Sequence, residues 1–372
     1  MSEYVLITGG AGFIGSHVAD ELLAQGHRVR ALDDLSPQVH GPGARRPSYL
    51  DPRVELVVGD VRDPAAVGRA LEGVDCVVHF AARVGVGQSM YEVAEYTQVN
   101  NVGTAVLLEA IAKRPVRRLV VASSMSVYGE GLFRDAAGHV RAAAGRPLEQ
   151  LCRGDWEVRG PAGEPLSPAP TPESKPVALE SVYALSKYDQ ERLCLIVGRA
   201  YKVSSVALRF FNVYGPRQAL SNPYTGVLAI FASRLLNDRP PLVFEDGRQM
   251  RDFVSVHDVK RAVVRALFAD GIDGLVLNVG SGAARSILDV ALEMRRVLGK
   301  PHIEPEITGR YRMGDVRHCF ADIGLAAQRL GYEPRVSFGD GLTELARWLE
   351  GQRPVDDGER ARAELEARGL TL

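Results

Sequence analysis

The first 210 residues alternate between short apolar runs and longer segments with helical spacing. The apolar runs are rich in Val, Leu and Ile and do not alternate strictly, as expected for strands that are buried on both faces. These runs are residues 4–8, 28–33, 54–60, 75–82, 117–124 and 204–210, and helical spacing marks residues 14–25, 64–72, 100–113 and 182–200. Repeated strand–helix units predict an α/β protein with a doubly wound parallel sheet of the Rossmann type.

The pattern becomes looser after residue 210. More helices are predicted at residues 225–237, 285–298 and 340–351, and the run VLNVG at residues 276–280 is expected to return to the main sheet. The second lobe should therefore be discontinuous in sequence. We predict a Rossmann domain of residues 1–209 with 253–282, a smaller α/β substrate-binding lobe of residues 210–252 with 283–350, and a charged tail of residues 351–372 with one short exposed helix.

A long insertion occupies residues 130–176. It is rich in Pro, Gly, Ala and Arg and has weak periodicity, so it should carry little regular structure. Such a segment is either a lid over an active site or an inert surface loop. Because it leads directly into the predicted helix at residues 182–200, we favour the lid.

Composition and charge exclude several classes of protein. The net charge of −1 over 372 residues gives no basic surface for nucleic acid or for a membrane. No apolar run is long enough to span a bilayer, and the opening MSEYVLITGG is already a strand and a turn, so we expect no signal peptide. Four scattered cysteines without C-x-x-C spacing predict neither disulfides nor a metal site, and a cytoplasmic location is expected.

The segment ITGGAGFIGSHVADELL predicts a dinucleotide site. Gly9, Gly12 and Gly15 follow a strand and open a helix, where glycines allow a tight turn and a close approach to a pyrophosphate. A strand–turn–helix alone can need glycines, but here a second strand ends in Asp33. A carboxylate there binds the adenosine ribose and repels a 2′-phosphate, which favours NAD over NADP, although a helix-cap role is the alternative. Further cofactor contacts are expected from Phe13, Ile14, Asp60, Val61, Phe80, Ala81 and Ala82.

Tyr183 and Lys187 are spaced i, i+4, so they share one face of a helix. A lone pair of this kind is usually a packing tyrosine beside a solvated lysine. The alternative is a phenol whose proton is loosened by the ammonium group and by a positively charged nicotinamide. Lowering a phenol pKa from about 10 by about three units takes roughly 4 kcal/mol.

Eight ordered motifs over residues 3–350 resemble the extended short-chain dehydrogenase/reductase family, in its nucleotide-sugar branch. They are TGGAGFIGS, HFAA, NNVGT, SSMSVYG, YALSK, RFFNVYGPRQ, RDFVSVHDV and YRMGDVRHCFADI. The resemblance implies that Tyr183 is the catalytic base and that Lys187 assists it and holds the nicotinamide ribose. Ser124 is implied to share the hydrogen bond to the reacting oxygen, and Asn100 to keep the active-site helix in place within the cofactor site.

The reaction is suggested by residues that are absent. The family's 4,6-dehydratases carry an Asp-Glu pair directly after the position of Ser124, and its decarboxylases carry a glutamate at the position of Ser126. This chain has Met125 and Ser126 there, and neither side chain transfers protons near neutral pH. The resemblance thus implies 4-epimerisation through a 4-keto sugar, with NAD regenerated in each turnover.

Substrate contacts are also implied by the resemblance. Asn212 and Arg251 match positions that bind the diphosphate, Arg312 matches one near the nucleotide ribose and phosphate, and Phe244 is expected against the base. Outside such motifs these arginines would be surface ion pairs. Val84 and Ser126, with Gly85 and Gln88, are candidates for the sugar pocket, whereas structural roles are assigned to His79, His257 and His318.

The sugar is the least determined feature of the sequence. Within the family the chain resembles the dTDP-L-rhamnose 4-epimerase group, which implies dTDP-L-rhamnose and dTDP-6-deoxy-L-talose as the substrate pair. A UDP-glucose/UDP-galactose-type 4-epimerase and a net NAD(H)-dependent sugar-nucleotide oxidoreductase are alternatives, and a non-catalytic NAD sensor is a weaker one. The family also implies a homodimer, paired through residues 92–113 and 182–200.

Overall fold

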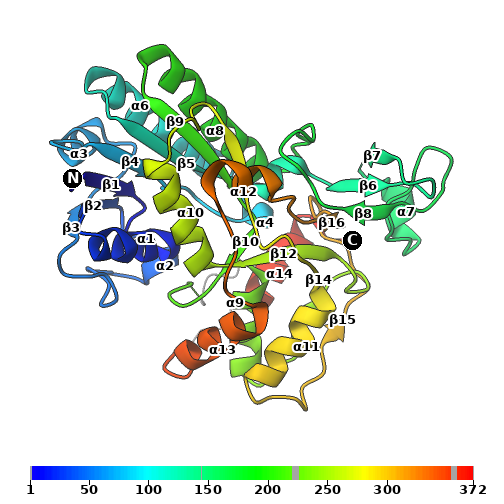
Figure 1. Ribbon diagram of the computed structural model, residues 1–372. Helices are drawn as coiled ribbons and strands as arrows, with labels where there is room; N and C mark the ends of the chain where they lie inside the picture. The colour runs from blue at the N-terminus through cyan, green and yellow to red at the C-terminus, as the bar shows by residue number, and fades with distance from the viewer. Residues whose placement is uncertain (1, 144, 220–225, 353–357, 372) are drawn as a thin grey trace.

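Seven parallel strands form the central sheet, in the order β13-β9-β5-β4-β1-β2-β3 (Figure 1). The structure is a computed structural model that describes residues 2–143, 145–219, 226–352 and 358–371. Each observed strand lies within a predicted apolar run, and β13 confirms the return of the chain to this sheet. The strands are β1 (Tyr4–Thr8), β2 (Arg28–Asp33), β3 (Glu55–Val58), β4 (Cys76–His79), β5 (Arg118–Ser124), β9 (Ser204–Phe210) and β13 (Val276–Val279).

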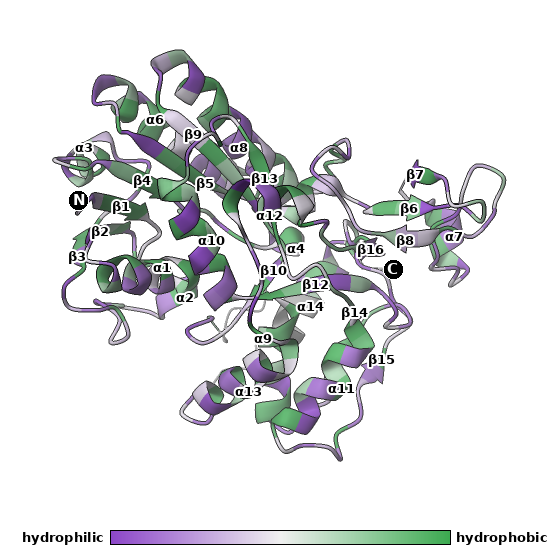
Figure 2. Cartoon of the chain, in the orientation of Figure 1, coloured by the Kyte–Doolittle hydropathy of each residue, from purple (hydrophilic) through white to green (hydrophobic). Residues whose placement is uncertain are grey.

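Helices cover both faces of this sheet, as a doubly wound fold requires. Along β1, Val5 and Ile7 enter one core while Leu6 enters the other, because successive side chains of a strand point to opposite faces. Hydrophobic residues follow the central strands in Figure 2, and hydrophilic residues mark the outer parts of the helices. The first core packs against α1 (Phe13–Ala24) and α10 (Val256–Phe268), and the second against α3 (Pro64–Ala70), α6 (Gly103–Lys113) and α8 (Val182–Tyr201).

The smaller lobe has its own sheet and its own core. Its strands are β10 (Asn212–Tyr214), β12 (Met250–Ser255), β14 (Ala284–Ser286) and β16 (His318–Cys319), with a separate pair formed by β11 (Leu242–Val243) and β15 (Glu306–Ile307). Three helices enclose the core: α9 (Val227–Leu236), α11 (Ile287–Val297) and α13 (Phe338–Leu349). Helices α9 and α11 lie within their predicted segments, whereas α13 begins and ends two residues earlier than the predicted 340–351. Residue 225 of the first segment is outside the described residues.

The insertion is more regular than predicted. Strands β6 (Leu132–Arg134), β7 (Val140–Ala142) and β8 (Ser167–Ala169) form an antiparallel sheet, accompanied by α7 (Leu148–Cys152), and this unit projects to the right in Figure 1. Phe133, Val158 and Leu166 form a small core inside it. Strands of three residues are too short to show a period of two, which explains why the sequence pattern missed them.

The tail also departs from prediction. The short helix is present as α14 (Gly358–Ala367), while residues 353–357 and 372 are outside the described residues. Leu365 is only 6% exposed, so the prediction of an exposed helix is wrong at this residue. A single leucine among charged residues gives no apolar face in the sequence pattern, and only its contacts reveal the burial.

Candidate active site

A cavity of about 630 Å³ lies where the strands of the central sheet end. Its lining includes residues at or just after the carboxyl ends of β1, β2, β4, β5 and β9, and it continues into the smaller lobe. This is the edge at which ligands bind in open α/β sheets. All residues predicted for the cofactor, the chemistry and the substrate line this cavity except Asn100 and Gln88, whose amide oxygen accepts from Gln38 and Tyr96 instead.

The glycine-rich turn leaves room only for backbone beside the cavity. A Cβ added to Gly15 would lie 2.4 Å from the carbonyl oxygen of Gly9, which has a φ of +69°. The Ala11 N–H donates to Asp33 Oδ2 at 2.9 Å, and the Leu35 N–H donates to Asp33 Oδ1 at 3.0 Å. The turn, the N-terminus of α1 and the Asp33 carboxylate therefore fit the pyrophosphate and the adenosine ribose of a dinucleotide.

The start of α8 positions the predicted catalytic pair. The Ser181 hydroxyl caps the helix by accepting from the Ala184 N–H at 3.1 Å, and the Tyr183 N–H donates to Ser89 Oγ at 3.0 Å. Tyr183 and Lys187 both line the cavity, one helical turn apart. At the end of β5, the Ser124 hydroxyl donates to the Ser126 hydroxyl at 3.1 Å.

Burial sets the protonation of this pair in the protein alone. It raises the pKa of Tyr183, against an opposing hydrogen bond with Ser124, and it lowers the pKa of Lys187 to about 8, against the attraction of Cys194 and Glu191. The predicted lowering of this pKa included a bound, positively charged nicotinamide, so its direction in the protein alone does not test that prediction. Burial is the larger effect here, and the protein's own residues do not favour the phenolate.

Two buried amide side chains, on Asn100 and Gln190, form hydrogen bonds to the helix that carries Tyr183 and Lys187. Asn100 lies in the π-helical segment Thr97–Val102, where its Nδ2 donates to Ser186 Oγ at 2.8 Å and its Oδ1 accepts from the Arg83 N–H at 2.7 Å. It therefore steadies α8 without lining the cavity. Gln190, which the sequence analysis missed, accepts from Lys187 Nζ at 2.6 Å. Its only sequence signal is its position three residues after the lysine.

The three family-motif histidines do not line the cavity. His79 lies between the hydroxyls of Thr8 and Thr104 at 2.7 and 2.8 Å, and burial lowers its pKa to about 3. The Nε2 atom of His257 lies 2.8 Å from Oε1 of Glu344. In the described part of the chain no three His, Cys, Asp or Glu side chains are grouped to hold a metal ion, and no helix there is long and apolar enough to cross a membrane.

The substrate end of the cavity carries a half-buried arginine that is held by backbone carbonyls. Arg251 donates to the carbonyl oxygens of Met250, Val316 and Arg317 at 2.5 to 3.0 Å. Among the residues that the structure describes, no carboxylate lies within 4 Å of its guanidinium nitrogens. Burial lowers the pKa of Arg251, against the attraction of Asp315. A guanidinium in this environment favours an anionic ligand.

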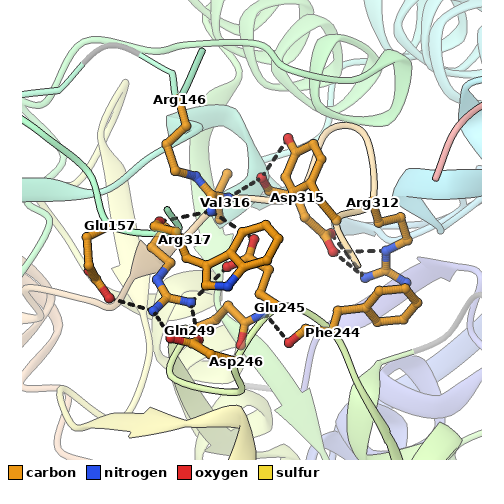
Figure 3. Close-up of polar contacts among 12 residues, drawn as sticks. Arg146, Glu157, Phe244, Glu245, Asp246, Gln249, Arg312, Asp315, Val316 and Arg317 are labelled. Carbon is orange, nitrogen blue, oxygen red and sulfur yellow. Dashed lines mark hydrogen bonds and ion pairs between the residues drawn. The ribbon is translucent and has the colours of Figure 1, made fainter. Parts of the chain in front are cut away.

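Two further predicted residues lie together at this end. The Arg312 guanidinium is 5.0 Å from the centre of the Phe244 ring and donates twice to the Asp315 carboxylate, at 2.9 and 3.0 Å (Figure 3). Nearby, Asn212 donates through its amide nitrogen to the Asp252 carbonyl oxygen at 3.0 Å. An aromatic ring, a stacked guanidinium and an amide suit a nucleotide better than an unmodified sugar.

The insertion docks beside this nucleotide end. Arg146 donates to Glu245 at 2.8 Å and to the Asp315 carbonyl oxygen at 3.3 Å, and Glu157 pairs with Arg317, whose side chain is fully buried (Figure 3). Burial raises the pKa of Glu245, against the attraction of Arg146. None of the described residues of the insertion lines the cavity, so the prediction of a lid is wrong. The insertion supports the loops that carry Phe244 and Arg312.

Comparisons with known proteins agree with this fold and show the family. The NAD dependent epimerase/dehydratase family model matches residues 5–148 and 157–280, and the chain belongs to this family. The predicted resemblance is thus confirmed at the level of the family.

Particular relatives carry different activities. The chain is 39% identical over 350 residues to dTDP-L-rhamnose 4-epimerase of Burkholderia thailandensis, with 93% of this chain and 94% of that protein covered. It is 30% identical to dTDP-glucose 4,6-dehydratase of an Actinoplanes species, with 94% and 98% covered. The crystal structure of Thermus thermophilus UDP-glucose 4-epimerase in complex with NAD matches with a TM-score of 0.74 at 30% identity, covering 94% of this chain and 99% of that one.

Arg146→Met should destabilise the folded protein by about 3 kcal/mol, because it leaves buried carboxylates with too few cationic partners. The Arg146 side chain is 2% exposed, and its partners Glu245 and Glu130 are 1% and 6% exposed. Arg153, an exposed arginine of the same insertion that pairs with Glu149, is the matched control. Arg153→Met should change stability by less than about 1 kcal/mol in urea unfolding. Equal effects of the two substitutions would contradict the role of the buried network.

Lys187→Met should remove a pH dependence of stability. The pKa of Lys187 is about 8 in the folded protein and 10.5 as its ordinary value. Between these values the unfolded state binds more protons, so the free energy of unfolding of the wild type rises with pH, by up to about 3 kcal/mol. The Met variant should lack this contribution in urea unfolding at pH 8 and pH 10 without nucleotide. The same slope in both proteins would show that Lys187 is not buried as described.

Proposed function

We propose that this protein is an NAD-dependent isomerase that inverts C4 of a nucleotide-diphosphate sugar, with dTDP-L-rhamnose and dTDP-6-deoxy-L-talose as its substrate pair. The observation that carries the proposal is the meeting of Ser124, Tyr183 and Lys187 at one cavity, next to Met125 and Ser126. The first three residues suit the removal and return of a hydroxyl proton. The other two provide no carboxylate for the loss of water or of carbon dioxide.

NAD, when bound, accepts a hydride from C4 and gives it back. The residues of the protein supply the positions and the proton transfer. Tyr183 takes the proton of the 4-hydroxyl, and Ser124 donates a hydrogen bond to the same oxygen as it becomes a carbonyl. Lys187 is released from Gln190 to bind the nicotinamide ribose, and its positive charge stabilises the phenolate. Inversion then requires that the keto sugar present its other face, so that C4 would recover the hydride on that face while the oxygen recovers the proton from Tyr183.

The protein's own raised pKa for Tyr183 makes the cofactor necessary for this step. Without a second positive charge the buried phenol remains protonated and cannot act as a base at neutral pH. A bound nicotinamide would supply that charge only in its oxidised form. Tyr183 would therefore deprotonate the sugar only when the bound cofactor is oxidised and can accept the hydride.

The residues at the two ends of the cavity support the proposed positions of NAD and of the nucleotide sugar. Asp33 offers a carboxylate to a ribose and would repel a 2′-phosphate, which supports NAD over NADP. At the other end, Arg251 and Asn212 suit the diphosphate, and Phe244 with Arg312 suits the base and its ribose. The sugar then falls between these groups, beside Tyr183.

The thymidine-linked deoxysugar is favoured by the higher identity to a dTDP-L-rhamnose 4-epimerase, 39% against 30% for the UDP-glucose 4-epimerase of known structure. A UDP-sugar 4-epimerase is the second candidate. A net oxidoreductase would need the cofactor to exchange in every turnover and would consume or release NADH stoichiometrically.

We also propose a homodimer through the segments at residues 92–113 and 182–200. Four large apolar side chains on these segments are 46% to 53% exposed in the single chain: Val93, Val102, Leu185 and Ile196. Burial of this surface in a partner would stabilise a dimer. Light scattering should give a mass of about twice the 40.4 kDa of the chain, and a monomer at micromolar concentration would contradict this interface.

The function is tested by incubating the protein with a panel of dTDP- and UDP-sugars and following their anomeric NMR signals. Conversion between C4 epimers without added cofactor is expected, most rapidly for dTDP-L-rhamnose. Tyr183→Phe should keep bound NAD and lose turnover by about 10²- to 10⁴-fold, because only the proton acceptor is removed. Loss of water, release of carbon dioxide, steady NADH formation or a fully active Phe variant would contradict the proposal.

A further inference from the structure

The C-terminal tail contributes a side chain to the active-site cavity. Leu365, near the end of α14, lines the cavity and is 6% exposed. It lies against Gly87 in α4 (Val86–Ser89), where an added Cβ would be 3.4 Å from Leu365 Cδ2. In Figure 1, α14 lies near the centre of the molecule, close to α4. Of the described tail residues, Leu365 alone belongs to the lining.

Contacts on one side of Leu365 fix the tail to the segment after α4. The Tyr91 hydroxyl donates to Glu364 Oε2 at 2.9 Å, and the Arg368 guanidinium is 4.3 Å from the centre of the Tyr91 ring. Tyr91 thus holds residues on both sides of Leu365. A hydrogen bond and a cation–π contact at adjacent turns restrict the rotation of α14 about its axis.

Contacts on the other side attach the tail to the loop that carries Arg312. The Met313 N–H donates to the Leu370 carbonyl oxygen at 3.0 Å, and Arg312 and Thr371 form an isolated antiparallel bridge. Arg310 and Glu366 add an ion pair. The tail therefore joins the α4 segment of the Rossmann domain to the nucleotide-binding loop of the smaller lobe, across the cavity.

This position places Leu365 at the sugar end of the cavity. In α4, Ser89 accepts the Tyr183 N–H, so α4 lies beside the start of the catalytic helix. The segment around α4 also gives Val84 and Val86 to the lining. The hydroxyl of Ser181, another lining residue, is occupied as the cap of α8. The wall formed by Val84, Val86 and Leu365 is apolar.

We propose that Leu365 is a specificity-determining residue, which closes the sugar subsite with an apolar wall and favours a methyl group at C5 of the sugar over a hydroxymethyl group. This inference rests on the proposed function and adds the residue that selects its 6-deoxy sugar. A methyl group gains from burial against leucine and valine, whereas a hydroxyl loses hydrogen bonds to water there. One such difference in an apolar pocket discriminates between ligands by about 10- to 200-fold.

The test compares sugar nucleotides that differ only in the oxygen at C6. Suitable pairs are dTDP-L-rhamnose with dTDP-L-mannose, and dTDP-D-fucose with dTDP-D-galactose. The wild type should prefer the methyl member of the pair that it accepts by about tenfold or more in kcat/KM. Leu365→Ala should reduce this preference at least about fivefold, and Leu365→Met should retain most of it because the wall stays apolar and filled.

Leu370→Ala is the matched control, because Leu370 is in the same tail and outside the lining, and the substitution keeps its backbone hydrogen bonds to Met313 and Leu365. It should keep the wild-type preference. An unchanged preference in Leu365→Ala, or a wild type that prefers the hydroxymethyl sugar, would overturn the assignment of Leu365.

Calorimetry can measure the affinity of the protein for each member of a pair, and so tests the same preference without turnover. A protein that binds and discriminates but does not interconvert C4 epimers would contradict the proposed function while leaving the role of Leu365 supported. A protein that epimerises both members equally would contradict the role of Leu365 and leave the proposed function standing.

Discussion

Parallel strands all end at the same edge of their sheet, and the active site of this protein depends on that constraint. Short polar or glycine-containing segments follow β1, β2, β4 and β5, and their separation in sequence does not matter once the strands are aligned. Gly9, Asp33, Phe80 and Ser124 reach one cavity because each lies at or just past the end of a strand. The hydrogen bonds of the sheet thus set the distances between groups that act on one ligand.

The same cavity holds charged groups that burial disfavours. Lys187 loses part of its affinity for a proton, Tyr183 holds its proton more tightly, and Arg251 is surrounded by carbonyl oxygens without a carboxylate partner among the described residues. Under the proposed function, a positively charged nicotinamide would favour the Tyr183 phenolate and a diphosphate would pair with Arg251. The binding of both is then expected before chemistry.

Two appendages to the common fold contact the loop that carries Arg312. The insertion does so beside buried ion pairs that join Arg146 and Glu157 to the smaller lobe. The tail also gives Leu365 to the lining of the cavity. Both connect segments that are far apart in sequence, so both restrict how the smaller lobe sits over the sheet. The insertion and the tail use different contacts because their surroundings differ. The insertion pairs its charges with buried carboxylates, and the tail places one leucine against an apolar wall.

The sequence by itself determined the strands and helices of the Rossmann domain and nearly every residue predicted to line the cavity, because glycine turns, buried strands and the Tyr183–Lys187 spacing are local patterns. Tertiary structure decided the rest. Asn100 lies behind the cavity because its amide is used by Arg83 and Ser186, and the insertion is no lid because its arginine finds Glu245, 99 residues further along the chain. The direction of the Tyr183 pKa and the burial of Leu365 depend on how much water neighbouring elements exclude, and no period or motif records a contact of that kind.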